Sequence, residues 1–179
     1  MVDNRVNIFL HPLMQYFSLF VPRYISANTI TLVGFVIGLI SVPLISAELY
    51  PVALIMILIN RFFDGLDGAV ARRNGITSFG GYLDITCDFI FYSAVVCSFA
   101  IADSEKNSMA VIFLVFSFVG TGTSFLAFAA IAKTHGIYSK EKGEKSFYYS
   151  LGLVEGTETV LFYILVCLFP GQFPIFALI

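Results

Sequence analysis

Long apolar runs occupy most of this 179-residue chain and restrict the folds open to it. Hydrophobic residues make up 58% of the sequence and charged residues 12%, where soluble domains carry about 25% charged residues. A helix needs about 20 mostly apolar residues to cross a bilayer. Five runs come close to that length, and we expect each to be a spanning helix: 28–48, 52–71, 79–102, 109–132 and 151–169. The sequence therefore predicts an all-α integral membrane protein.

A shorter apolar segment precedes the first run. Polar side chains interrupt it within residues 1–25, so it is too short and too polar to span, and it lacks the small-residue cleavage site of a signal peptide. We expect a helix that lies in the membrane interface. Its lipid-facing side would carry Phe9, Leu10, Leu13, Phe17 and Phe20.

A sixth apolar run begins at Phe173, and the chain stops at Ile179. Seven residues are too few to cross a membrane. The run is either the start of a truncated sixth span, which we favour, or a short segment packed on the bundle. We expect a single domain over residues 1–179, with the transmembrane bundle over 28–179.

Basic residues gather on one side of the predicted bundle. If the spans alternate in direction, one side receives Arg5, Arg23, Arg72, Arg73, Lys133, Lys140, Lys142 and Lys145, and the other only Lys106. Positive charge marks cytoplasmic loops, so we expect a cytoplasmic N-terminus. The net charge of −2 argues against a nucleic-acid partner. The cysteines lie in apolar runs without paired spacing, which favours buried thiols over a disulfide or zinc site: Cys87, Cys97 and Cys167.

Four aspartates lie in the second and third runs, although a charge at the centre of a bilayer costs about 2.5–3.5 kcal/mol. Asp64 and Asp67 are three residues apart, and Asp84 and Asp88 are four apart, so each pair shares a helix face. If the two runs form an antiparallel hairpin, the four carboxylates meet toward the cytoplasmic side. Divalent cations, which prefer oxygen ligands, are the most economical compensation. Two such ions about 3.5–4 Å apart would clamp a phosphoryl group for in-line displacement.

Small and basic residues flank these acids. Gly68, Ala71 and Gly80 leave room for a bulky ligand to approach the helix backbone. Arg72 follows Gly68 by one turn, where a guanidinium can hold a phosphate oxygen. Arg61 lies one turn before the first aspartate, and we expect it to pair with a carboxylate, with a contact to the acceptor or a phosphate as the alternative.

These residues form one pattern of eight fixed positions. It reads Asp-xx-Asp-Gly-xx-Ala-Arg from Asp64 to Arg72, then Gly-xxx-Asp-xxx-Asp from Gly80 to Asp88. The pattern resembles the signature of the CDP-alcohol phosphatidyltransferase family, and the similarity covers roughly residues 20–170. One departure is that seven residues, and not the family's usual eight, separate Arg72 from Gly80.

The resemblance implies a six-helix membrane bundle that forms a homodimer. It implies that an alcohol attacks the β-phosphorus of a CDP-linked lipid, CDP-diacylglycerol, and releases CMP. Two Mg²⁺ or Mn²⁺ ions would be held by Asp64, Asp67, Asp84 and Asp88, and Asp88 would also be the general base. The residues that would line the CDP pocket are Gly68, Ala71, Arg72 and Gly80.

The polar stretch after the fourth run is the predicted site for the small polar alcohol. The candidates are Lys133, Lys142, Lys145, Glu155 and Glu158. A solvated basic loop, and carboxylates stabilised at a helix N-terminus, are simpler explanations of the same residues. Two other functions remain open: a choline- or ethanolamine-type phosphotransferase that uses a soluble CDP-alcohol and a lipid acceptor, and a divalent-cation transporter.

Overall fold

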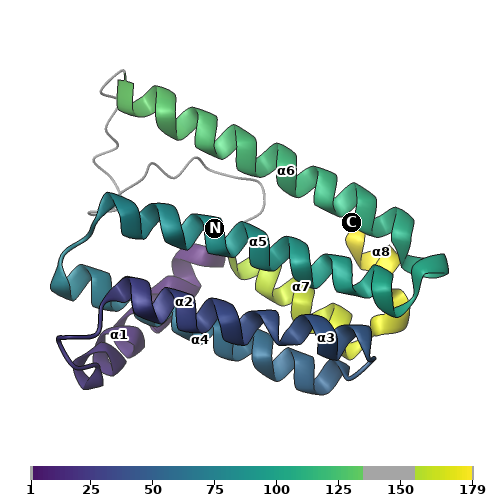
Figure 1. The fold of residues 1–179 in the computed structure, drawn as a ribbon, viewed down its shortest axis with the longest axis horizontal. Helices are drawn as coiled ribbons and strands as arrows, with labels where there is room; N and C mark the ends of the chain where they lie inside the picture. Colours follow the sequence, from purple (N-terminus) through teal and green to yellow (C-terminus); the bar gives the residue numbers. More distant parts are fainter. Residues whose placement is uncertain (1, 135–155, 179) are drawn as a thin grey trace.

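The computed structural model describes residues 2–134 and 156–178, and all regular secondary structure within them is helical. The helices are α1 (Val2–Phe20), α2 (Ala27–Leu39), α3 (Ser41–Ser46), α4 (Tyr50–Asn74), α5 (Ser78–Ala102), α6 (Ser104–Thr134), α7 (Gly156–Leu168), the 3₁₀ turn η1 (Pro170–Gln172) and α8 (Phe173–Ala177). The predicted all-α fold is confirmed, and the expected runs correspond to α2–α3, α4, α5, α6 and α7 (Figure 1).

Three helical segments in the described part of the chain are long and apolar enough to cross a membrane: Ala27–Ser46, Ser78–Ala102 and Ser104–Phe128. A fourth would be the pair Glu158–Leu168 and Pro170–Ala177, if the two are counted as one span despite the bend of 114° between them. Helix α4 has 25 residues, a length of about 37 Å, but charged side chains crowd its second half. The chain is therefore an integral membrane protein, and the count of six spans stays a prediction.

Successive helices of the bundle run in opposite directions, so that the start of α2, the end of α4 and the start of α5 lie at the same end of the molecule (Figure 1). Gly75 links α4 to α5 with φ +112°, a conformation that glycine adopts without strain. The Thr77 side chain then accepts a hydrogen bond from the backbone N–H of Gly80 at 3.0 Å and caps α5. Helices α4 and α5 therefore run antiparallel, as expected, but each packs more closely on α2 and α3 than the two pack on each other.

Helix α2 packs closely on α4 through two glycines. A Cβ on Gly34 would lie 2.6 Å from Cβ of Phe63, and one on Gly38 would lie 2.8 Å from Nδ2 of Asn60. The Gly-xxx-Gly spacing therefore serves close helix contact, as such spacings do in membranes. Ser26 caps the start of α2, because its side chain accepts a hydrogen bond from the Thr29 backbone N–H at 3.2 Å.

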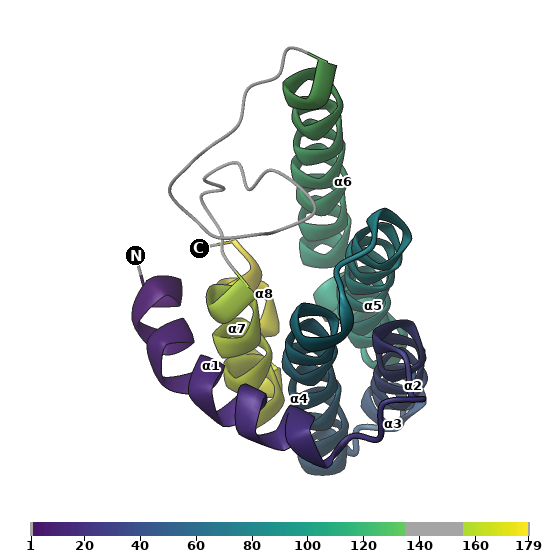
Figure 2. The same ribbon diagram turned by 90° about the vertical axis from the view of Figure 1, so that its left-hand side faces the viewer.

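Helix α6 projects from the bundle beyond α5 (Figure 2). Only 11% of its span Ser104–Phe128 is buried, against 33% for the α5 span. The core lies instead around α5, where Phe91 and Phe99 are buried. Cys87 and Cys167 are buried as predicted, but Cys97 is exposed, because it lies on a face of α5 that no described helix covers.

The two ends of the chain pack on this bundle. Helix α1 lies against α4, and its carboxyl end is held by Arg73, which donates hydrogen bonds to the backbone oxygens of Ser18 and of Val21, the latter at 3.0 Å. At the other end, the buried ring of Phe173 stacks on Phe99 with centroids 4.5 Å apart. Residues 173–177 therefore pack as a short segment, while the interfacial position of α1 stays a prediction.

Candidate acidic metal site

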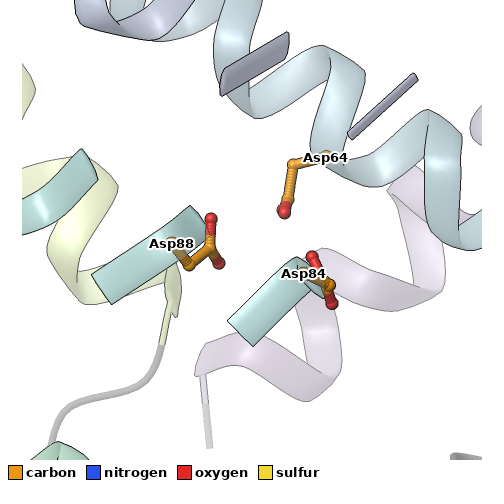
Figure 3. Close-up of side chains that lie close together, drawn as sticks. All are labelled: Asp64, Asp84 and Asp88. Atoms are coloured by element: carbon orange, nitrogen blue, oxygen red, sulfur yellow. The ribbon is translucent and has the colours of Figure 1, made fainter. Parts of the chain in front are cut away.

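Three of the four predicted carboxylates meet between α4 and α5. Asp64 comes from α4, and Asp84 and Asp88 come from α5 (Figure 3). One carboxylate oxygen from each of the three lies within 4.8 Å of the others. The side chains of Asp64 and Asp88 are 34% and 27% exposed, so the cluster is partly open. The spacings of three and four residues contribute to this convergence because each places its acids on one face of a helix.

Asp67 lies outside this group of three. It is 4% exposed and accepts a hydrogen bond from the hydroxyl of Thr31 on α2. It nevertheless borders the same small cavity as Asp64 and Asp88, between α2, α4 and α5. The sequence predicted that all four acids hold metal, whereas the structure separates Asp67 as the one bonded to α2.

Arg61 is the cation that faces the acids, as the pairing prediction required. Its Nη2 lies 2.6 Å from Oδ1 of Asp88, and its Nη1 lies 3.5 Å from Oδ2 of Asp64. Nη1 also donates to the hydroxyl of Tyr92 at 2.7 Å, and that hydroxyl donates to Oδ2 of Asp88 at 3.2 Å. Both oxygens of Asp88 therefore have donors from the protein.

The residues predicted to contact CDP lie at the same end of the hairpin. Gly68 and Ala71 are half-buried on α4. The exposed side chain of Arg72 folds back over Gly68, so that its Nη1 would lie 3.4 Å from a Cβ added to this glycine. Gly80 has a second reason to be glycine, because a Cβ there would lie 3.0 Å from Oδ1 of Asn28 on α2. Close packing of α5 on α2 thus explains this glycine without a ligand.

Most of the predicted acceptor residues lie outside the described part of the structure. These are Lys142, Lys145 and Glu155, together with the side chain of Lys133 near the end of α6. Glu158 is exposed in the first turn of α7. This position agrees with the simpler explanation, a carboxylate stabilised at a helix start.

Two polar contacts at the site were missing from the sequence-based prediction. Tyr92 follows Asp88 by four residues, so its position on the same face of α5 was available as a signal. Thr31 gave no signal, because the hydroxyl of a threonine in an apolar helix usually bonds to its own helix, and the Oγ1 atom of this one also lies 3.1 Å from the Ala27 carbonyl oxygen.

The donor set fits a hard divalent cation. Mg²⁺ and Mn²⁺ prefer carboxylate oxygens, and the three clustered aspartates offer only such ligands. Within the described residues, Arg61 is the cation that forms ion pairs with these acids, through Asp64 and Asp88, so the cluster keeps excess negative charge. The fold and site thus define an integral membrane protein with an acidic cluster, suited to a divalent cation, between two consecutive helices.

Comparison with known proteins identifies the family to which this chain belongs. A model of the CDP-alcohol phosphatidyltransferase family matches residues 24–177. The chain is 47% identical over 174 residues to the inner membrane protein YnjF of Escherichia coli, covering 97% of this chain and 84% of that protein. The chain belongs to the CDP-alcohol phosphatidyltransferase family and is an enzyme of that class.

Two further relatives carry more descriptive names. The archaetidylinositol phosphate synthase of Pyrococcus horikoshii is 30% identical over 126 residues, which are 68% of this chain and 65% of that protein. The crystal structure of a Mycobacterium tuberculosis phosphatidylinositol phosphate synthase, with CDP-DAG bound, matches with a TM-score of 0.66 at 22% identity. That match covers 93% of this chain and 84% of the other, and it shows that the fold is shared.

Proposed function

We propose that the enzyme transfers a phosphatidyl group from CDP-diacylglycerol to a small polar alcohol and releases CMP. The observation that carries this proposal is the cluster of Asp64, Asp84 and Asp88 between consecutive helices, beside glycines and an arginine in the family's pattern. The related mycobacterial synthase has CDP-DAG bound, and this supports a CDP-lipid as the donor. The archaeal relative is named for an inositol phosphate product, so we include phosphorylated alcohols among the acceptors to be tested.

The cluster suits a diphosphate substrate only when its charge is compensated. Mg²⁺ or Mn²⁺, as two ions held by Asp64, Asp84 and Asp88 with Asp67 alongside, would supply the positive charge that holds the diphosphate. Arg72 lies at the open end of α4, where its guanidinium can hold a phosphate oxygen. Gly68 and Ala71 beside it are small residues that leave room for a ligand to approach the helix backbone, so we assign the nucleotide to this face of α4.

Asp88 is our candidate for the general base. The acceptor oxygen attacks the β-phosphorus, its proton passes to the Asp88 carboxylate, and the bond from the β-phosphorus to the bridging oxygen breaks. CMP leaves with that electron pair. A carboxylate has about four lone-pair sites, and Arg61 and Tyr92 occupy only part of them, which leaves room for this proton.

The remaining assignments complete the proposal. We expect the site to face the cytoplasm, because basic residues mark cytoplasmic loops and a soluble acceptor would be met there. Lys133, Lys142, Lys145, Glu155 and Glu158 remain the candidate acceptor residues. As in related enzymes, we expect a homodimer.

The test is CMP release from CDP-diacylglycerol in proteoliposomes, with a panel of alcohols and alcohol phosphates. Asp88→Asn should lose roughly 10²-fold or more of the parent's turnover, because general bases contribute about 10²–10⁴-fold. Near-parental turnover by this variant would remove Asp88 from the base role. Metal uptake into the same liposomes without CMP release would favour a cation transporter instead, and turnover of a soluble CDP-alcohol would favour the choline- or ethanolamine-type reaction.

A further inference from the structure

Arg61 is a largely buried cation in direct contact with two of the clustered acids. Its side chain is 12% exposed, and its guanidinium reaches Asp88 at 2.6 Å and Asp64 at 3.5 Å. A charge in such a place is retained only with compensating partners. Here the partners are the same carboxylates that would hold a divalent cation, so the arginine and the metal compete for one set of negative charges.

Other contacts hold Arg61 in place without these acids. Its Nε donates to Oδ1 of Asn60 at 2.8 Å, and its Nη1 donates to the Tyr92 hydroxyl at 2.7 Å. The guanidinium carbon also lies 5.1 Å from the ring centroids of both Phe91 and Tyr92, within the range of cation–π attraction. Asn60 is in turn fixed by a 3.0 Å hydrogen bond to the Gly34 carbonyl. The arginine is therefore a built-in part of the site.

We propose that Arg61 is an internal counter-cation, which offsets charge in the metal-free acidic cluster and holds Asp88 in a fixed orientation. The inference rests on the metal-dependent transfer proposed above. Two separable consequences follow. The positive charge opposes metal binding, since it lies close to two ligands. The planar fork, which spans both oxygens of Asp88, aids turnover by fixing the carboxylate for its role.

Removing the charge should therefore move metal binding and catalysis in opposite directions. In Arg61→Gln we expect Mn²⁺ to bind about tenfold more tightly, a coupling of the size seen between contacting groups. We expect kcat for CMP release to fall about tenfold, because Asp88 is no longer held. Arg61→Lys keeps the charge and loses the fork, so its Mn²⁺ affinity should stay within about threefold of the parent while kcat falls.

Thermal unfolding gives a readout that is independent of turnover. Without metal, Arg61→Gln should melt below the parent, because the acids lose their counter-charge. Saturating Mn²⁺ should narrow this difference in Tm, since a ligand that binds the folded variant more tightly stabilises it more. Arg73→Gln is the matched control. Arg73 donates hydrogen bonds to backbone oxygens of α1 and its following turn and is not paired with the acids, so the decrease in Tm relative to the parent should be the same with and without Mn²⁺.

The full-length enzyme in detergent is used, with Mn²⁺ binding followed by electron paramagnetic resonance. Unchanged or weaker Mn²⁺ binding in Arg61→Gln would overturn the proposal, as would a Tm difference that Mn²⁺ leaves constant. Failure of Arg61→Gln to fold even with Mn²⁺ would overturn it as well, because the metal should replace the missing charge. Parental kcat in Arg61→Lys would remove the orienting role. If the parent enzyme binds Mn²⁺ but releases no CMP, the proposed reaction is refuted. The Mn²⁺ affinities and the Tm differences of the variants would then still decide whether Arg61 is a counter-cation.

Discussion

The hydroxyl of Thr31 on α2 donates a hydrogen bond to Oδ2 of Asp67 on α4. Asp67 is 4% exposed, so this contact joins a buried carboxylate to the neighbouring helix. The same aspartate lines the small cavity that is also lined by Asp64 and Asp88. One residue of the family's motif thus links the acidic site to the packing of α2 on α4.

Thr31→Val should reveal the value of this bond. Valine keeps the shape of threonine but leaves a buried carboxylate oxygen without its donor, and we expect the free energy of unfolding to fall by about 1–3 kcal/mol. Thr31→Ser keeps the hydroxyl and is the control. Reversible denaturation in mixed detergent micelles, followed by circular dichroism, measures both. Equal stability of the valine variant and the parent would show that the bond contributes nothing.

Gly34→Ala should disturb the contact between α2 and α4. The added Cβ would lie 2.6 Å from Cβ of Phe63, which is too close for any real contact, so the helices must move apart. Overpacking of this kind costs about 1–3 kcal/mol. Gly120→Ala on α6 is the control, because no described residue lies within 4 Å of its added Cβ, and a stability gain of up to about 1 kcal/mol is expected there. The same denaturation assay should separate the two alanines, and equal effects would contradict this account.

Asp64→Asn should weaken the response to metal. The substitution removes one of the three clustered charges, and the Mg²⁺ concentration for half-maximal CMP release should rise about tenfold or more. Asp103→Asn is the control, since it lies at the opposite end of α5, where its side chain caps the Lys106 backbone N–H at 3.1 Å. The measurement is a metal titration of turnover after removal of bound ions with a chelator. A parental titration curve for Asp64→Asn would exclude it as a ligand.

Arg73→Ala should loosen α1 from the bundle. Arg73 donates to the backbone oxygens of Ser18 and Val21, where α1 ends and the chain turns toward α2. Without it, chymotrypsin should cut near Phe20 and Tyr24 several-fold faster, because cleavage requires local opening of the chain. Arg23→Ala, an exposed arginine in the same turn, is the control and should leave the cleavage rate unchanged. Mass spectrometry of the fragments identifies the sites, and equal rates in the two variants would count against the clamp.

The hairpin and its three clustered acids could be predicted because their cause is local. Spacings of three and four residues place acids on one helix face, and a short glycine-bearing link reverses the chain so that both acid-bearing segments lie at the same end of the molecule. Arg61 could be expected to pair with a carboxylate because it lies one turn from Asp64 on the same face.

Contacts between distant segments could not be predicted in the same way. Nothing in the sequence near Thr31 or Asp67 selects one as the partner of the other, because the pairing depends on how closely α2 approaches α4. The assignment of Gly80 to a ligand pocket had the same weakness, since its contact with Asn28 depends on helix packing. The 114° bend after α7 also depends on tertiary packing, because the ring of Phe173 stacks on Phe99.

The short α4–α5 link bears on how the protein enters its membrane. All three acids and their compensating arginine belong to one continuous hairpin, residues 50–102. Two consecutive helices can leave the translocation channel as a pair, with opposite charges already in contact, so neither must cross the lipid with a bare charge. Biogenesis of the charged centre thus needs only neighbouring segments, and later helices can assemble around a unit whose negative charge Arg61 already offsets in part.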